Sequence, residues 1–236
     1  TQADRVKIFE DYFAHIEATG INGSLFWNLG YPRMYETLFH DCEAVGNWMR
    51  DVNSDATGLA VDDSFFAQGK GSLKLSFDPA RVNGKAVWDL NNLSEKWVVR
   101  VNDGLPTGIN RTRCAVQVAN PGGPVKIALA VSTGPQLLWH ESQPHTLIGG
   151  LNKWNKVSFD LSSRMWKSSA TNWQFNGEIK NLEDVRKVSI ILYDYPAASS
   201  IYIDDMTISR DDGFVIYPDD PAVETIRAHG KRMKAK

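Results

Sequence analysis

Three of the eight tryptophans in this sequence stand among polar residues: Trp48, Trp88 and Trp139. Asp89 follows Trp88 directly. Glu141 lies two residues after Trp139 and is therefore in phase with it along a strand. We expect indoles in such surroundings to lie on an outer face of the fold, where exposed aromatic groups mark binding sites. The alternative is that these tryptophans are buried in the core.

Rings of this kind are suited to binding sugars. An indole covers the apolar C–H face of a pyranose, and burying about 100 Å² per ring contributes roughly 2.5 kcal/mol. The hydroxyl groups at the sugar edge need polar partners, for which the outward strand residues are candidates: Arg113, Gln117 and Glu141. Two or three stacked rings, less the cost of ordering, predict an affinity of about micromolar. The alternative for each polar residue is a solvated strand face.

The central region, residues 40–211, consists of short runs in which apolar and polar residues alternate. Ser72–Phe77 and Arg113–Val118 are examples, and turn clusters such as Asn120–Gly123 separate the runs. Eight or more such strands without a long helix predict an all-β fold, a β-sandwich of the jelly-roll type.

The two ends of the chain differ from this region. Residues 1–39 begin with apolar residues at helical spacing and continue with the apolar run Ser24–Leu29, which predicts a helix followed by a buried strand. Residues 212–236 combine an acidic, proline-containing stretch with a short helical pattern and a basic end, which predicts a linker or C-terminal tail. The sequence therefore predicts three parts, with boundaries at 39/40 and 211/212.

Carboxylates at the two ends of the central region indicate a cation site. Asp41 and Glu43 precede its first strands, and Asp204 lies in its last strand. First and last strands are commonly neighbours in a jelly roll, and carbonyls of the turn at Lys70 would complete an oxygen-rich shell. The prediction is a structural Ca²⁺ with these ligands: Glu43, Asp204, Asp41 and Lys70. The alternative is two ordinary clusters of surface carboxylates.

Composition excludes several classes of protein. The 26 basic and 28 acidic side chains nearly cancel, which argues against nucleic-acid binding. Hydrophobic residues make up 42% of the chain, which is enough for a core. The sequence contains no run of about 18 apolar residues, the length that a membrane-spanning helix needs. Cys42 and Cys114 are too few for a disulfide framework, and their apolar neighbours predict buried thiols. The lack of a start Met and of a signal peptide predicts a mature or excised piece of a longer protein.

Residues 40–211 resemble a jelly-roll carbohydrate-binding module. The resemblance is carried by Asp41-Cys42-Glu43, Gly46-Asn47-Trp48, Gly69–Leu75, Lys153–Leu161 and Ser200–Asp205. The spread of the three tryptophans is similar to that of the ligand-stacking tryptophans in family 27 modules, which bind β-mannan. The resemblance implies Trp48, Trp88 and Trp139 as sugar platforms, and it implies Glu43 and Asp204 as the main side-chain ligands of Ca²⁺.

Residues 5–38 resemble the end of a glycoside hydrolase family 5 barrel, with Phe9–Gly23 like its seventh helix and loop and Ser24–Leu29 like its eighth strand. Trp27 would then form the floor of the catalytic cleft. Mannanases of that family often carry family 27 modules, so the two resemblances imply a parent endo-β-mannanase. In that family the two catalytic carboxylates come from strands four and seven, which would precede Thr1. A full barrel takes about 250 residues, more than the 236 of this chain. We therefore expect no catalytic residue and no hydrolysis by this chain alone.

Three hypotheses of function follow. The first is a non-catalytic module that binds β-mannan, or alternatively β-glucan, and targets a secreted, extracellular mannanase to polysaccharide; the rest of the barrel, as a separate chain, would be a further partner. The second is a jelly-roll polysaccharide hydrolase or lyase, for which Glu141 and Asp194 are scattered candidates. The third is a structural sandwich that mediates protein contacts, in which Trp88 and Trp139 would be buried.

Overall fold

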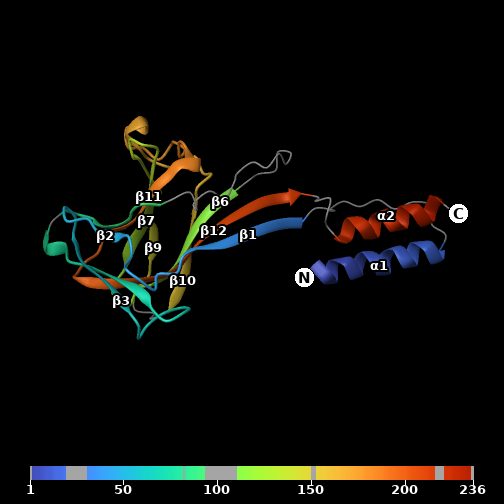
Figure 1. Cartoon of the computed structure of the whole chain (residues 1–236), viewed down its shortest axis with the longest axis horizontal. Helices are drawn as coiled ribbons and strands as arrows, with labels where there is room; N and C mark the ends of the chain where they lie inside the picture. The colour runs from blue at the N-terminus through green and yellow to red at the C-terminus, as the bar shows by residue number, and fades with distance from the viewer. Residues whose placement is uncertain are drawn as a thin grey trace. The chain divides into compact units, whose positions relative to one another are not determined.

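The computed structural model describes residues 2–19, 31–81, 83–93, 111–149, 153–215 and 221–234, which belong to two compact units. The larger unit spans residues 34–106 and 110–211 and contains the sandwich, and the smaller unit contains the two long helices (Figure 1). The predicted strand Ser24–Leu29, with Trp27, lies outside the described residues.

The larger unit is built from two six-stranded sheets (Figure 1). Sheet A has the order β10-β6-β12-β4-β3, and β1 also pairs with β12. Sheet B has the order β2-β5-β11-β7-β8, and β9 also pairs with β7. The strands are β1 Tyr31–His40, β2 Trp48–Arg50, β3 Ala56–Asp62, β4 Ser72–Phe77, β5 Ala86–Leu90, β6 Arg111–Ala119, β7 Val125–Thr133, β8 Leu138–Glu141, β9 His145–Leu147, β10 Trp154–Asp160, β11 Val185–Tyr193 and β12 Ser199–Val215. This architecture confirms the predicted all-β sandwich of the jelly-roll type.

Alternation along the strands determines which side chains enter the core. In β7, Ile127, Leu129 and Val131 are buried between the two sheets. The intervening residues Ala128 and Ala130 face the other way and belong to a separate small apolar cluster on the outer face of sheet B. The sandwich therefore has one main core and, outside sheet B, a second apolar surface on which side chains can gather.

The smaller unit contains α1 (Gln2–Thr19) and α2 (Pro221–Lys234), which pack on each other. The ring of Phe13 is fully buried and stacks on His229 with 4.1 Å between ring centroids. Oε1 of Glu17 lies 2.8 Å from Nδ1 of His229 and accepts a hydrogen bond of 2.9 Å from Nε of Arg232. The predicted N-terminal helix is confirmed. The short helical pattern predicted within residues 212–236 is present as α2, in which Ala222 and His229 are buried.

Crossing a bilayer requires a longer and more apolar helix than any found among the described residues.

Candidate functional site

Two of the three predicted sugar platforms are buried inside the sandwich. Trp48 in β2 is 2% exposed, Trp88 in β5 is 0% exposed, and both belong to the main hydrophobic core. The indole N–H of Trp88 donates to the carbonyl of Gly58 at 2.9 Å, so its polar group is satisfied within the fold. The prediction that Trp48 and Trp88 stack on sugars is therefore wrong.

The alternation of β5 explains this burial. Ala86, Trp88 and Leu90 face the core, so Asp89 points to the opposite side of sheet B. Adjacent residues of a strand point to opposite faces, so a polar residue directly after a tryptophan shows that the opposite face, and not the face of the tryptophan, is exposed. Trp48 faces inward as well, because it pairs in register with Leu90.

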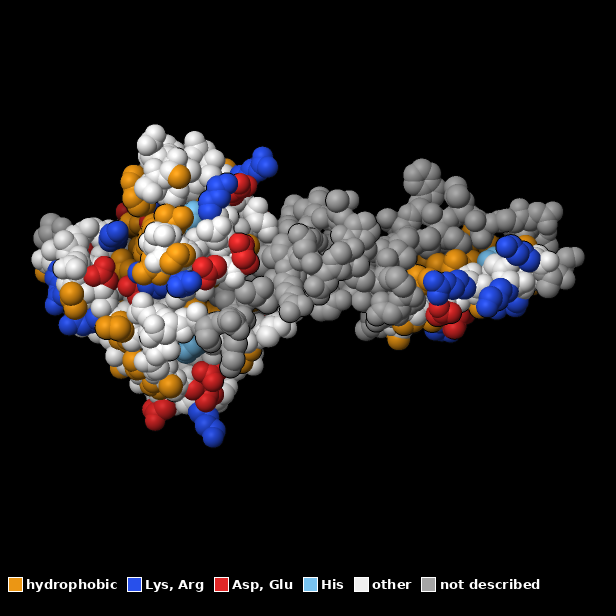
Figure 2. Space-filling model, turned by 45° about the horizontal axis from the view of Figure 1, so that its top comes forward, with side chains coloured by type: hydrophobic (Ala, Val, Ile, Leu, Met, Phe, Trp, Pro, Cys, Tyr) orange, Lys and Arg blue, Asp and Glu red, His pale blue; other side chains and the backbone are white. Residues whose placement is uncertain are grey.

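Trp139 and Glu141, which are in phase along β8, lie together on the outer face of sheet B. They help to form a hollow of about 560 Å³, a volume typical of ligand sites. The residues that line it come from three strands, β5, β8 and β11, and from three connecting segments: Asp51, Lys85, Val87, Asp89, Trp139, Glu141, Lys167, Trp173, Lys187 and Tyr193. On one face of the molecule, hydrophobic side chains gather beside basic and acidic ones (Figure 2).

The sheet beneath this hollow is covered by small or aliphatic side chains. Val87, Ala128, Ala130 and Ile191 are buried in one cluster, against which Trp139 and Tyr193 pack. Alanine has only a Cβ, so the sheet surface is low along β7 and the larger aromatic and charged side chains rise around it. The result is an apolar floor with an aromatic and polar wall.

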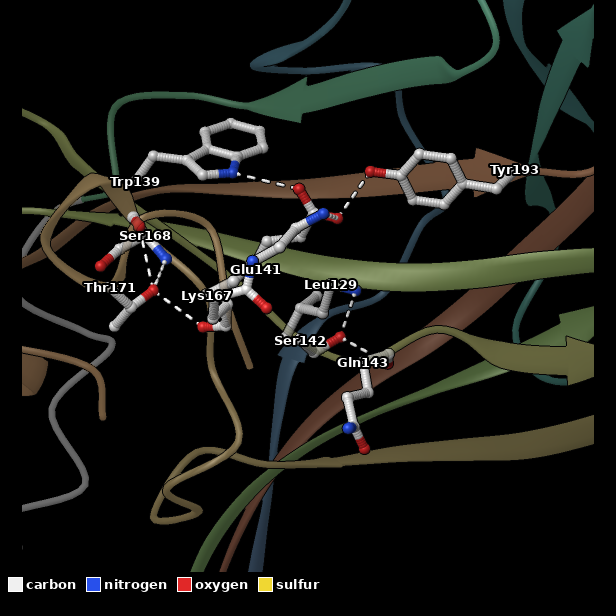
Figure 3. Close-up of polar contacts among 10 residues, drawn as sticks. Leu129, Trp139, Glu141, Ser142, Gln143, Lys167, Ser168, Thr171 and Tyr193 are labelled. Carbon is white, nitrogen blue, oxygen red and sulfur yellow. Dashed lines mark hydrogen bonds and ion pairs between the residues drawn. The ribbon is translucent and has the colours of Figure 1, made fainter. Parts of the chain in front are cut away.

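Glu141 is the most connected polar residue of this wall, and its side chain is 3% exposed. Its Oε1 accepts hydrogen bonds from the Tyr193 hydroxyl at 2.6 Å and from Nζ of Lys167 at 2.8 Å. Its Oε2 accepts a longer bond of 3.4 Å from Nε1 of Trp139 (Figure 3). Burial, together with the bond to Glu141, raises the pKa of Tyr193 well above its usual value, so the hydroxyl remains a donor.

A second polar group lies on β5 and β11. Oδ1 of Asp89 accepts a hydrogen bond of 2.6 Å from the Ser189 hydroxyl, and Oδ2 forms an ion pair of 3.3 Å with Nζ of Lys187. The same ammonium group lies 5.2 Å from the centroid of the Trp139 ring. Lys187 and Asp89 are each about one fifth exposed, so both can reach a molecule in the hollow.

Trp173 completes the aromatic part of the site, and 54% of its surface is exposed. It lies in the segment 162–181, which joins β10 to β11, and its backbone has a φ of +60°. The backbone N–H of Trp173 donates to the carbonyl of Ser168 at 2.9 Å, which fixes this turn. A bulky residue with positive φ is uncommon and stores strain, a feature that is frequent at functional sites.

Sequence reasoning missed Trp173, Tyr193 and Lys187. Trp173 could have been found, because its neighbours are polar and no apolar alternation surrounds it. Tyr193 and Lys187 could have been found from the parity of β11, because Val188 and Ile190 face the core and the odd-numbered positions from 187 to 193 face outward.

Arg113 and Gln117, predicted to bind sugar hydroxyls, do not belong to this hollow. Both lie in β6 of sheet A, where Cys114 and Val116 face the core and they face outward. The hollow lies outside sheet B, on the other side of the sandwich, so the prediction that they share a site with Trp139 is wrong. A sequence alone gives the face of each strand but not the sheet in which the strand lies.

The carboxylates of the predicted Ca²⁺ site do gather near one loop, 65–70. Oδ2 of Asp204, which is fully buried, accepts hydrogen bonds from the backbone N–H groups of Ala67 at 2.8 Å and Gln68 at 3.1 Å. Oε1 of Glu43 accepts one from the N–H of Lys70 at 2.8 Å. Gly69 allows this approach, because a Cβ there would come within 1.7 Å of the same oxygen.

Negative charge accumulates at this loop. Asp41 is exposed and accepts a bond of 3.2 Å from the N–H of Glu43. Burial, followed by the charges of Asp204, Asp41 and Glu43, raises the pKa of Asp205. Within the described part of the chain, however, no three His, Cys, Asp or Glu side chains are arranged to hold one metal ion together.

Comparison by sequence finds neither a matching protein family nor a matching curated protein. The solved structures that are similar in fold include the three that follow. The solution structure of CtCBM11 has 11% identity and a TM-score of 0.51 over 77% of this chain and 96% of that one. An exo-β-agarase has 12% identity and a TM-score of 0.51 over 72% of this chain and 25% of that one. A family 11 carbohydrate-binding module from Clostridium thermocellum, in complex with a β-1,3-1,4-mixed-linked tetrasaccharide, has 10% identity and a TM-score of 0.49 over 77% and 98%.

At these identities the comparison establishes the fold. The larger unit is a β-sandwich jelly roll, and its structural neighbours include carbohydrate-binding modules. The resemblances to family 27 and to a family 5 barrel stay predictions.

Proposed function

We propose that the hollow on the outer face of sheet B binds carbohydrate and that the chain is a non-catalytic polysaccharide-binding protein. The observation that carries this proposal is the meeting of Trp139, Trp173 and Tyr193 with Asp89 and Lys187 around one hollow. Aromatic rings cover the C–H faces of pyranoses, and charged groups that are partly exposed bond the hydroxyls at the edge. The jelly-roll fold supports the proposal, because carbohydrate-binding modules share it.

The ligand class follows from the charges. Three lysines and three carboxylates line the hollow, and the charges balance: Lys85, Lys167, Lys187, Asp51, Asp89 and Glu141. Two of the lysines are already paired with carboxylates of the same wall. A site without surplus charge favours a neutral sugar over a uronic acid or a sulfated sugar.

Within the neutral polysaccharides, β-mannan stays our first candidate because residues 40–211 resemble mannan-binding modules, although Trp48 and Trp88 are buried and Trp139 alone of these three tryptophans lines the hollow. β-Glucan is the second candidate, and agarose belongs in the comparison because a similar structure is part of an exo-β-agarase. A polysaccharide ligand also agrees with an extracellular site of action and with a role in targeting a parent endo-β-mannanase, which we retain as part of the proposal.

Affinity electrophoresis tests the proposal. We expect galactomannan in the gel to retard the chain, and we expect polygalacturonate to leave its migration unchanged. Glucomannan, mixed-linkage β-glucan and agarose in parallel gels rank the alternatives. Unretarded migration in all of these gels would show that the hollow is not a polysaccharide site.

The rival hypothesis of a hydrolase or lyase gains no support from the candidates that the sequence offered, Glu141 and Asp194. Asp194 does not line the hollow and is paired with Lys126 on the surface. Asp89 and Glu141 lie on two strands that are separated by β11 and β7, and Ser189 and Ala130 are the residues between them in register. Three strand spacings place the backbones of Asp89 and Glu141 roughly 14 Å apart. Retaining hydrolysis needs carboxyl groups about 5 Å apart. A structural sandwich with both tryptophans buried is also less well supported, because Trp139 lines the hollow.

We also propose that Ca²⁺ binds at loop 65–70, where Glu43, Asp204, Asp41 and the carbonyl of Lys70 would have to move together to hold it, because no three carboxylates of the described residues converge on one point there. The donor chemistry fits this ion, since all four are oxygen ligands and the cluster carries surplus negative charge. At about a hundred-fold excess over its Kd, Ca²⁺ is expected to raise the melting temperature of the chelator-treated chain by about 5–10 °C. Glu43→Gln should reduce that rise; an equal melting temperature with and without Ca²⁺ would exclude the site.

A further inference from the structure

Glu141 lies where three parts of the hollow wall meet. Trp139 and Tyr193 approach its carboxylate from opposite sides, and Lys167 comes from a third direction (Figure 3). Each of these side chains donates to an oxygen of Glu141, at distances between 2.6 and 3.4 Å. The two aromatic rings are therefore tied to one buried carboxylate.

The backbone of Glu141 makes a further connection. Its N–H donates to the carbonyl of Lys167, and the N–H of Lys167 donates to the carbonyl of Glu141, both at 2.9 Å. This two-way bridge joins the segment 162–181 to β8 at the same residue pair that forms the ion pair. Trp173 is carried by that segment, and its N–H is held by Ser168, the residue after Lys167. Glu141 thus connects to the elements that carry all three aromatic residues.

The burial of Glu141 decides what it can do. With 3% of its side chain exposed and three donors on its two oxygens, it has little capacity left to bond a sugar hydroxyl. Removing it would leave Lys167 and the Tyr193 hydroxyl without their acceptor in a partly buried site, and such unpaired groups are costly.

We infer that Glu141 is a positioning residue that holds Trp139, Tyr193 and the segment 162–181 in the arrangement that receives a sugar. This inference rests on the proposed function and deepens it, because it assigns Glu141 an indirect role in place of direct hydroxyl binding. Affinity then depends on the acceptor oxygens of residue 141 and not on its charge alone.

Isothermal titration of the full chain with mannohexaose, and with cellohexaose as a second probe, tests the inference. Glu141→Ala should weaken binding at least about ten-fold. Glu141→Gln should restore affinity to within about five-fold of the parent chain, because an amide oxygen still accepts from Tyr193. Glu178→Ala is the matched control, since Glu178 is an exposed glutamate of the same segment, pairs with Lys180 and does not line the hollow. Its affinity should equal that of the parent.

A spectroscopic measurement separates positioning from general destabilisation. The indole N–H resonance of Trp139 should move in Glu141→Ala and return towards its parent position in Glu141→Gln. Tyr193→Phe removes only one donor to Glu141, so it should fold and should weaken binding less than Glu141→Ala. If Glu141→Ala does not fold, Glu141→Gln and Tyr193→Phe decide the question.

The possible failures are distinct. A parent chain that binds neither probe overturns the proposed function. Loss of binding in Trp139→Ala, with parent affinity and an unmoved Trp139 resonance in Glu141→Ala and Tyr193→Phe, overturns the positioning role alone.

Discussion

The ammonium group of Lys187 lies over the ring of Trp139, 5.2 Å from its centroid. Asp89 forms an ion pair with the same group at 3.3 Å, and the ammonium group of Lys187 has further N–H donors that can bond a ligand next to the ring. We predict that Lys187→Met weakens oligosaccharide binding about ten-fold, because a hydrogen bond from a charged donor contributes about 1.5 kcal/mol or more. Calorimetric titration measures the change.

Lys126→Met is the control for this prediction. Lys126 also lies on the outer face of sheet B, but it pairs with Asp194 and does not line the hollow. Equal effects of the two substitutions would contradict a specific role for Lys187.

Trp88 and Trp173 should respond to substitution in opposite ways. Trp88→Ala empties a fully buried position, so we predict a loss of about 3–5 kcal/mol in the free energy of unfolding. Trp173→Ala should change stability by less than about 1 kcal/mol, because the side chain is largely exposed, but it should weaken sugar binding. Denaturant unfolding and titration of both variants check this contrast. A stable Trp88→Ala variant with reduced affinity would restore the discarded platform.

The two thiols should be unreactive in the folded chain. Burial raises the pKa of Cys114 to about 12 and, with the charges of Asp204 and Asp41 as further causes, raises that of Cys42. At about pH 8 neither cysteine has an appreciable thiolate fraction, so we predict no reaction with a disulfide reagent in the native state. Both should react in concentrated guanidinium chloride. Rapid labelling of one thiol in the native chain would show that the segment that carries it opens.

The contact between α1 and α2 should weaken in acid. Hydrogen bonds from Arg232 and His229 lower the pKa of Glu17 to about 2, below its value of about 4.3 in an unfolded chain. A lowered pKa stabilises the folded state above about pH 4.3, and this contribution disappears as the pH falls towards about 2.

The difference in melting temperature between the parent and Glu17→Gln should therefore be largest near neutral pH and vanish near about pH 2. Glu10→Gln on the same helix is the control, and its effect should not follow this course. A Glu17→Gln effect that is constant between about pH 6 and pH 2 would contradict the ion-pair account.

Period-two alternation predicted the sandwich and much of its core, because side-chain parity is a local property of a strand. The same rule, applied consistently, places Asp89 outside and Trp88 inside, and it pairs Trp139 with Glu141 on one face. Polar neighbours in sequence were a poor guide for Trp48 and Trp88, since adjacent residues point to opposite faces.

What sequence could not provide was the pairing of distant strands. Arg113 and Glu141 both alternate outward, yet β6 belongs to sheet A and β8 to sheet B. Lys167 reaches Glu141 only because the segment 162–181 folds back onto β8, a contact set by tertiary structure. For the same reason the helix in 212–236 could not be matched to α1 in advance.

The affinity of Trp139→Ala for mannohexaose and cellohexaose tests the central claim most directly. Trp139 is the one predicted platform that lines the hollow in the described part of the chain, and losing its stacking surface should cost about 2.5 kcal/mol. The account predicts that the affinity for the preferred oligosaccharide falls about sixty-fold while the melting temperature stays within a few degrees of the parent. Parent-like affinity in a folded Trp139→Ala chain would contradict a sugar site in this hollow.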